Sequence, residues 1–172
     1  MPWTQPADEA EMPPRRFVKC EEAYSTMDIY LKKRYDLIPN LVETVKGYAK
    51  HESETLESVV AARGAAVSAK TPEAKAAAEG TLNNALSRLM VISESYPELK
   101  ANANFVDLQR QLQQMENEIA NSRKYYNGVV KSYNIKCQSI PSNIVASMAH
   151  FTVKPLFEIT NEVERANVKV QF

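Results

Sequence analysis

Four polar residues recur along one side of the segment 103–139, and they are the residues best placed for chemistry. Glu116, Arg123, Asn127 and Asn134 are spaced by 7, 4 and 7 residues. On a helix that turns by about 100° per residue, their side chains lie within about 40° of one another. Such a line is either an unrecognised catalytic site or a set of polar side chains that fixes helix register. The second interpretation is favoured, because charged residues beside an apolar seam usually serve packing.

Two Tyr–Asn pairs stand seven residues apart on the same predicted helix. Tyr126–Asn127 and Tyr133–Asn134 each direct a tyrosine into the apolar seam and an amide to its flank. On the first predicted helix, Arg34 occupies a seam position, with Asp36 and Asn40 nearby. These residues are the candidate structural or interaction site, together with Pro39 and the polar line.

Pro39 creates a specific need for a hydrogen-bond donor. Proline lacks a backbone N–H, so a helix that continues through Pro39 leaves the carbonyl of Tyr35 without its donor. A buried carbonyl without a donor costs about 1–3 kcal/mol. We expect a side-chain donor or an ordered water to cap it. The candidate donors are Arg34, Asn40, Arg123 and Asn127.

Signatures of metal, cofactor and nucleophile chemistry are absent from the sequence. A di-iron bundle needs Glu-x-x-His pairs, but neither histidine, His51 or His150, has Glu three residues before it. There is no Gly-rich phosphate loop, GxSxG elbow or paired Cys–His motif. Cys20 and Cys137 are expected to be thiols in a reducing compartment. The sequence therefore predicts no metal, no cofactor and no enzymatic activity.

Composition favours a helical protein that does not bind nucleic acid. The 172 residues include 21 basic and 21 acidic residues, whereas proteins that bind nucleic acid usually carry a basic surplus. Only four glycines occur, which disfavours a turn-rich β fold. No stretch approaches the roughly 18 apolar residues of a membrane span.

The element that must position Arg34 and Pro39 is a long first helix. Apolar residues recur in steps of three and four from Phe17 to Ala66 without a change of phase at Pro39. This pattern favours one helix over about 14–68, kinked near Pro39. The alternative is a split, with Asp36 capping a new helix and Pro39 in its first turn.

Three further helices are predicted. Thr71 is expected to cap a helix over about 73–95 that Pro97 closes, and Asn102 or Asn104 to cap the helix at 103–139. A short helix follows at about 143–149, and the stretches around 151–159 and 168–172 alternate as extended chain does.

Together these elements form an all-α, elongated, antiparallel up-and-down bundle. Residues 1–13 are expected to form a disordered leader, 14–150 the bundle, and 151–172 an extended tail that packs on the bundle.

Two basic clusters stand on the first helix. The candidate membrane-facing residues are Arg15, Arg16, Lys19, Lys32 and Lys33. A solvated helix face is the default interpretation. The alternative is contact with anionic lipid, to which each well-placed basic residue adds about 1 kcal/mol.

Several motifs in this order resemble the LemA family. They are "KKRYDLIPNLVETVKGYAKHE", "ALSRLMVISESYPELKANANF", "ENEIANSRKYYNGVVKSYN", "KPLFE" and "VKVQF", and the resemblance covers residues 17–172. It implies a helical bundle related to the magnetosome protein MamQ, with no established activity or cofactor. Family members are usually anchored by one N-terminal transmembrane helix, with the bundle on the cytoplasmic side. That helix is replaced here by "MPWTQPADEAEMPP", so we expect either that the anchor was removed or that this member is soluble.

The resemblance also marks individual positions. They are all the residues of the candidate site given above except Glu116, together with Tyr96 and Pro97. Glu118 stands where the family often has a basic residue, which puts a charge pairing there in doubt.

Three functions are considered. The favoured one is a non-enzymatic, membrane-associated scaffold or adaptor that binds a protein the sequence does not identify. The alternatives are a lipid-binding or membrane-shaping protein acting through its basic end, and an unrecognised enzyme using the Arg/Asn/Tyr line near Pro39. The sequence fixes neither the partner nor an oligomeric state.

Overall fold

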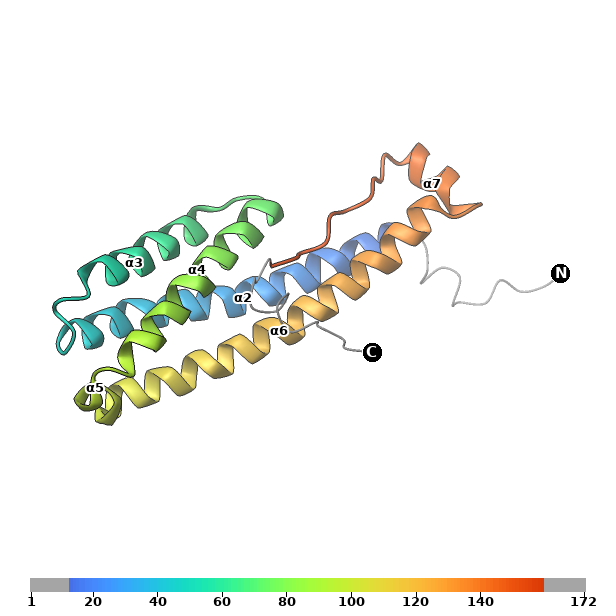
Figure 1. Ribbon diagram of the computed structural model, residues 1–172. Coiled ribbons are helices and arrows are strands. Elements are labelled where there is room, and N and C mark those ends of the chain that lie inside the picture. Colours follow the sequence, from blue (N-terminus) through green and yellow to red (C-terminus); the bar gives the residue numbers. More distant parts are fainter. Residues whose placement is uncertain (1–12, 160–172) are drawn as a thin grey trace, which may run out of the picture. The chain divides into compact units, whose positions relative to one another are not determined.

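The computed structural model describes residues 13–159 as helices and connecting segments (Figure 1). The elements are α2 (Pro13–Lys46), α3 (Ser53–Ser68), α4 (Pro72–Ser93), α5 (Pro97–Ala101), α6 (Ala103–Gln138) and α7 (Ser142–Met148). Residues 151–159 follow without regular secondary structure, as expected. The all-α prediction is confirmed. Residues 1–12 of the leader and the stretch 160–172 lie outside the described residues, so the domain division stays a prediction.

The chain forms two compact units. Unit 1 contains residues 13–31 and 117–157, and unit 2 contains 32–116 with 158–159. Helices α2 and α6 each contribute residues to both units. Each unit is therefore built from sequence-distant segments, and each has its own buried residues and polar contacts.

The first helix runs through Pro39 but is shorter than predicted. Helix α2 includes Pro39, so the continuous interpretation is confirmed against the split one. It ends at Lys46 instead of continuing to residue 68. The backbone N–H groups of Tyr48 and Ala49 both donate to the carbonyl of Val45, at 3.0 and 2.8 Å, and a turn follows. The seam continues in phase because both helices bury their apolar faces, so the repeat cannot distinguish one helix from two.

Helix α3 folds back beside α2, and this supplies the donor that Pro39 removes. Nε of Arg63 on α3 donates to the carbonyl of Tyr35 at 2.8 Å. The prediction of a side-chain donor is confirmed, but the four residues named for it were wrong. On a single helix Arg63 would lie about 42 Å from Tyr35, at 1.5 Å per residue. The turn after Lys46 therefore makes the contact.

Caps and prolines define the remaining helices. The hydroxyl of Thr71 accepts a hydrogen bond from the N–H of Ala74 at 3.2 Å, and Pro72 is the first residue of α4. Oδ1 of Asn102 accepts from the N–H of Phe105 at 3.0 Å, which selects Asn102 over Asn104 as the cap of α6. Pro97 was predicted only to close the preceding helix. It begins the short helix α5, because proline is tolerated where no N–H is needed.

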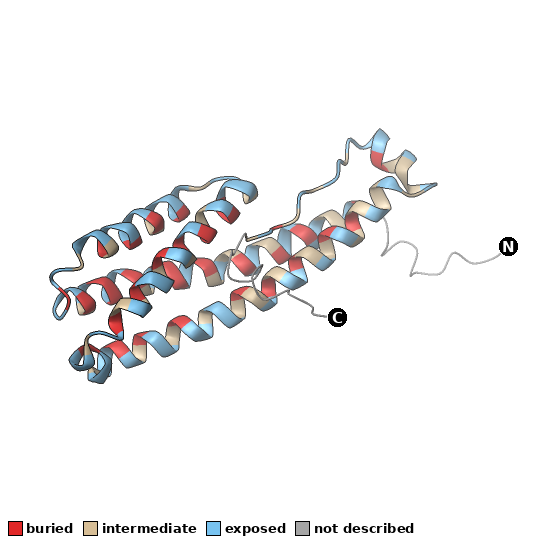
Figure 2. Cartoon of the chain, in the orientation of Figure 1, coloured by how far each residue is buried: buried red, intermediate tan, exposed pale blue. Residues whose placement is uncertain are grey.

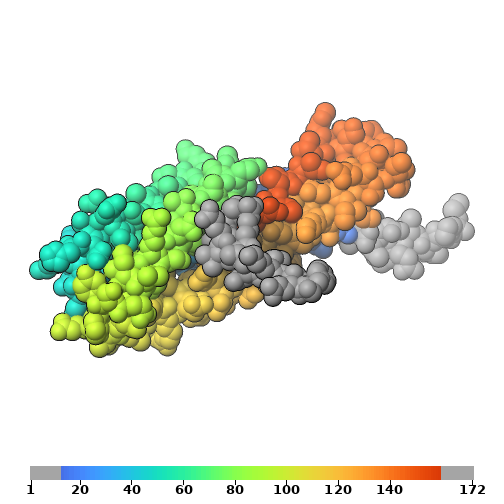
Figure 3. All heavy atoms as spheres, viewed as in Figure 1, coloured from blue at the N-terminus to red at the C-terminus, as the bar shows by residue number. Residues whose placement is uncertain are grey.

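Each unit buries its own apolar set. Figure 2 shows α3 and α4 carrying buried residues along one face and exposed residues along the other. The two helices pack together and form a continuous surface in Figure 3. In unit 2 the fully buried side chains include Leu41, Val45, Val59, Leu82, Leu89, Leu99 and Phe105. In unit 1 the ring of Phe17 contacts those of Tyr133 and Phe151, at centroid distances of 6.1 and 5.6 Å.

The Arg63 contact can be tested with a mutant cycle around Pro39. We expect Arg63→Met to lower the free energy of unfolding by about 1–3 kcal/mol, because the buried Tyr35 carbonyl loses its donor. In a Pro39→Ala background the same change should cost less, since the N–H of the new alanine can donate to that carbonyl. Urea unfolding followed by circular dichroism measures both values.

Arg88→Met, at an exposed position of α4, is the control and should change stability by less than about 0.5 kcal/mol. Equal costs of Arg63→Met in the two backgrounds would contradict the assignment of Arg63 as the cap.

Candidate functional site

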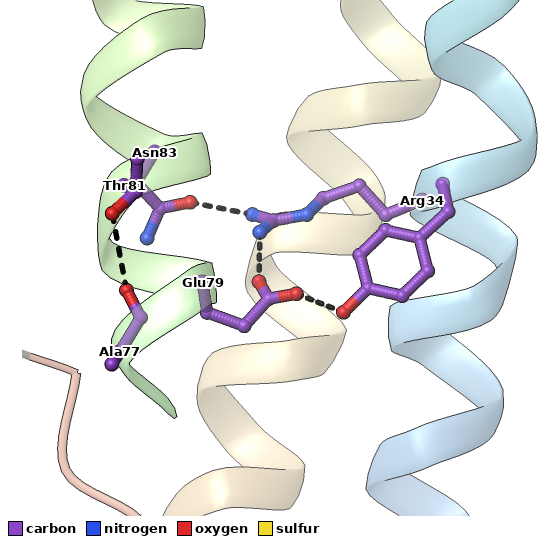
Figure 4. A network of polar contacts seen from close by, with 6 residues as sticks. Arg34, Ala77, Glu79, Thr81 and Asn83 are labelled. Carbon is purple, nitrogen blue, oxygen red and sulfur yellow. Dashed lines mark hydrogen bonds and ion pairs between the residues drawn. The ribbon is translucent and has the colours of Figure 1, made fainter. Parts of the chain in front are cut away.

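A buried ion pair connects α2 and α4 within unit 2. Arg34 is 3% exposed and Glu79 is fully buried. Nη2 of Arg34 donates to Oε2 of Glu79, and Nη1 donates to Oδ1 of Asn83 at 2.7 Å (Figure 4). The hydroxyl of Tyr35 donates to the other carboxylate oxygen of Glu79. Both oxygens of this carboxylate are therefore satisfied inside the protein.

Tyr35 is held by a second contact. The ring of Tyr35 lies beneath Nζ of Lys75, which is 5.8 Å from the ring centroid, and Lys75 itself is largely buried. A cation over an aromatic face is attracted by the negative face of the ring. Lys75 and Glu79 are four residues apart and therefore lie on one face of α4. From that face Lys75 contacts the ring of Tyr35, and Glu79 accepts a hydrogen bond from its hydroxyl.

A groove of about 560 Å³ opens beside Arg34 between α2, α4 and α6. Its lining is mainly polar and includes Asn83, Asn84 and Ser87 of α4, and Gln109, Gln113 and Glu116 of α6. Nε of Arg34 is buried and has no hydrogen-bond partner within the described part of the chain. The groove is thus a concave, polar-lined feature at Arg34, whereas Pro39 is exposed and does not line it.

In unit 1 the predicted amides bind backbone. Asn127 donates to the carbonyl of Phe157 at 3.0 Å and accepts from its N–H at 2.9 Å. Asn134 makes the same pair of bonds with Lys154, both at 2.8 Å. The hydroxyl of Tyr133 donates to the carbonyl of Thr152 at 2.7 Å. Three residues of the repeated Tyr–Asn pairs, namely Asn127, Tyr133 and Asn134, therefore hold an extended segment along α6.

The other predicted residues are dispersed. Tyr126 is buried against Tyr24, at a centroid distance of 5.6 Å, and Arg123 is half-buried. Asp36, Pro39 and Asn40 are exposed on α2. Of the predicted polar line, Glu116 belongs to unit 2, whereas Arg123, Asn127 and Asn134 belong to unit 1.

The basic residues likewise fall in both units. Lys32 and Lys33 are exposed in unit 2, and Arg15 is exposed in unit 1. Arg16 and Lys19 line a hollow of about 320 Å³ together with Tyr125, Gly128, Val129 and Ser132.

Burial keeps two ionisable groups of unit 1 neutral. It raises the pKa of the Cys20 thiol above its ordinary value. Burial, together with a hydrogen bond to the thiol of Cys137, also raises the pKa of Tyr133. Neither group supplies a thiolate nucleophile or a phenolate base at neutral pH, because the nucleophilic form of each is disfavoured.

The residues that complete these contacts were not predicted from the sequence. Glu79 and Asn83 satisfy Arg34, and Arg63 satisfies Tyr35. A signal for Glu79 was present: it stands three residues before the seam residue Leu82, as a single acid in an alanine-rich stretch. An acid and a base that both lie on buried helix faces are expected to pair, which would have pointed to Glu79 as the partner of Arg34.

Residues 13–159 lack the signatures of a metal site and of a membrane-spanning helix. These residues contain no group of three or more His, Cys, Asp or Glu side chains placed to hold a metal ion. Within the same range no helix combines the length and apolar character that a bilayer crossing requires.

The fold and its internal polar contacts define an all-α helical protein whose buried ionic and amide groups bind other parts of the chain. Residues 23–172 match the LemA family, which confirms the resemblance noted in the sequence. The chain belongs to the LemA family.

Several relatives extend this comparison. The chain is 33% identical over 81 residues to magnetosome protein MamQ 2 of Paramagnetospirillum magneticum, covering 47% of this chain and 30% of that protein. It is 26% identical over 153 residues to magnetosome protein MamQ of Magnetospirillum gryphiswaldense, covering 74% and 56%. It is 23% identical over 149 residues to protein LemA of Metamycoplasma hominis, covering 86% and 68%. The chain thus spans less than two thirds of the length of both MamQ proteins.

The buried pair predicts a strong, non-additive effect on stability. Arg34→Leu and Glu79→Leu should each lower the free energy of unfolding by about 3–5 kcal/mol, because each leaves an uncompensated buried charge. The double variant should be more stable than either single variant. Chemical denaturation of all three measures the coupling.

The exposed pair Lys100–Glu94 is the matched control, with side chains 46% and 63% exposed. Its leucine variants should show a coupling of no more than about 1 kcal/mol. Additive losses at Arg34 and Glu79 would show that the buried pair does not exist in solution.

Proposed function

We propose that this LemA-family chain is a non-enzymatic, membrane-associated scaffold or adaptor that binds another protein. The observation that carries the proposal is a row of exposed apolar side chains at α7. Membrane association is supported by the anchoring that is usual in the family.

The polar candidates have structural uses that compete with catalysis. Arg34 is engaged by Glu79 and Asn83, and the amides of Asn127 and Asn134 each make two bonds to backbone. A general acid or base must reach a substrate with its reactive atom. Groups already committed to internal partners serve better to fix the arrangement of helices than to perform chemistry.

The α7 apolar row consists of Ile144 and Met148 on α7, which are 59% and 79% exposed, and Ile140 in the turn before the helix, which is 85% exposed. The step of four residues places Ile144 and Met148 on one face of α7. Exposed large apolar side chains that lie together mark interaction surfaces in proteins. Methionine adds adaptability, because its unbranched side chain fits irregular partner surfaces. This row is the surface that we assign to the protein partner.

Affinity capture followed by point variants tests the adaptor function. Tagged full-length chain should recover a reproducible partner from bacterial membranes, and the variant Ile144→Ser/Met148→Ser should lose it. Val91→Ser is the matched control, since Val91 is 71% exposed but lies on α4 in unit 2. Mass spectrometry of the recovered proteins measures the outcome. A recovery that is unchanged by the α7 variant, or equally lost with the control, would contradict the assignment.

Direct lipid binding is a second candidate, and the hollow at Arg16 and Lys19 favours it. Two basic side chains, a hydroxyl and an exposed tyrosine surround this hollow. Basic groups attract the negative surface of anionic lipid, and tyrosine is suited to a membrane interface.

Vesicle flotation distinguishes this candidate from the adaptor. Binding to phosphatidylglycerol vesicles should fall with added salt, and Arg16→Glu/Lys19→Glu should weaken it by about tenfold or more, at about 1 kcal/mol for each basic residue lost. Lys32→Glu/Lys33→Glu makes the same charge change at two residues that do not line the hollow, and it should have a smaller effect. Equal binding to neutral vesicles, or binding that salt does not alter, would exclude the lipid role.

A further inference from the structure

The groove beside Arg34 contains an unsatisfied buried donor. Arg34 is nearly completely buried, and its Nη1 and Nη2 atoms have partners, but Nε has none within the described residues. A buried N–H without an acceptor costs about 1–3 kcal/mol, so native proteins usually provide one. The groove of about 560 Å³ is where that acceptor can be placed, because Arg34 is one of its lining residues.

The lining of this groove suits an extended peptide. Asn84, Gln109 and Gln113 carry amides, each of which both donates and accepts, as a peptide unit does. The apolar side chains Leu86, Met90 and Leu112 also line the groove. The charge of Arg34 is balanced by Glu79, so the remaining charge in the lining is the carboxylate of Glu116. The lining therefore fits a segment that alternates apolar and polar residues and carries a basic side chain.

The same chain already uses this recognition chemistry. In unit 1, Asn127 and Asn134 on α6 each make two hydrogen bonds to the backbone of Phe157 and Lys154. Side-chain amides are thus the means by which one stretch of extended chain is held on a helix. Gln109 and Gln113 place two of the groove amides on the part of α6 that belongs to unit 2.

We propose that the groove binds residues 160–172 of the same chain. These residues lie outside the described ones. Val168, Val170 and Phe172 alternate with polar residues, which in extended chain puts the three apolar side chains on one face, toward Leu86, Met90 and Leu112. Lys169 supplies the basic group for Glu116, and a backbone carbonyl of the segment accepts from Nε of Arg34. Glu158 and Ile159, which precede the segment, are grouped with the groove in unit 2.

This inference is independent of the proposed adaptor and lipid functions. It concerns unit 2, whereas the α7 apolar row and the basic hollow belong to unit 1. Either can therefore fail without the other.

Site-specific photocrosslinking in the full-length chain tests the proposal. Gln113, which lines the groove, is replaced by p-benzoylphenylalanine, and crosslinked peptides are identified by mass spectrometry after irradiation. We expect an intramolecular crosslink to a residue between 160 and 172. Gln114 is the matched control, because it is an exposed glutamine on the same helix that does not line the groove and points about 100° away. The control position should not give this crosslink.

A second variant tests the apolar contacts. Val168→Ser/Val170→Ser/Phe172→Ser should abolish the crosslink from position 113 while the helical circular dichroism signal stays unchanged. If the probe at Gln113 lowers that signal, the exposed groove residue Ser87 carries the probe instead. Absence of the crosslink, a crosslink to a different segment, or a crosslink between two copies of the chain would overturn the proposal.

Discussion

The ion pair between Arg34 and Glu79 is the constraint on which unit 2 depends. Removing two charges from water costs several kcal/mol per ion unless each finds partners of good geometry. Glu79 obtains Arg34 and the hydroxyl of Tyr35, and Arg34 obtains Glu79 and Asn83. These contacts are possible in one register of α4 against α2, because a shift by one residue would turn the carboxylate by about 100°. The pair therefore specifies which faces of α2 and α4 meet. Apolar packing alone determines this register less strictly.

Other polar groups that interrupt the apolar pattern also have specific partners. Pro39 removes a donor from α2, and Arg63 replaces it only because the chain turns after Lys46 and α3 returns along α2. In unit 1, amides at a helical spacing hold an extended segment in place of another helix. Polar side chains in this protein thus make hydrogen bonds to backbone at places where apolar packing between helices does not satisfy the chain. This use of polar side chains and the exposed apolar row at α7 are the observations behind the proposed adaptor function.

Much of the fold was predictable because its signals are local. The caps at Thr71 and Asn102 and the apolar seam of α6 depend on residues within a few positions of one another. The turn after Lys46 was not predictable from the seam, since two helices that share a core keep the same phase as one. The candidate residues Arg34, Asn127, Tyr133 and Asn134 were identified, but their partners were not. Glu79, Lys154 and Phe157 lie 45, 20 and 30 residues away from their respective partners Arg34, Asn134 and Asn127, and only the tertiary fold makes them neighbours.

The central claim is that Arg34 is a buried structural cation, and NMR of the arginine guanidinium groups tests it most directly. In full-length protein labelled with ¹⁵N, the terminal nitrogens of Arg34 should give separate resonances whose protons exchange slowly with water, because each nitrogen holds its own acceptor in a site that excludes solvent. Exposed Arg88 provides the reference and should show averaged, rapidly exchanging signals. Arg34 signals that resemble those of Arg88 would contradict the account.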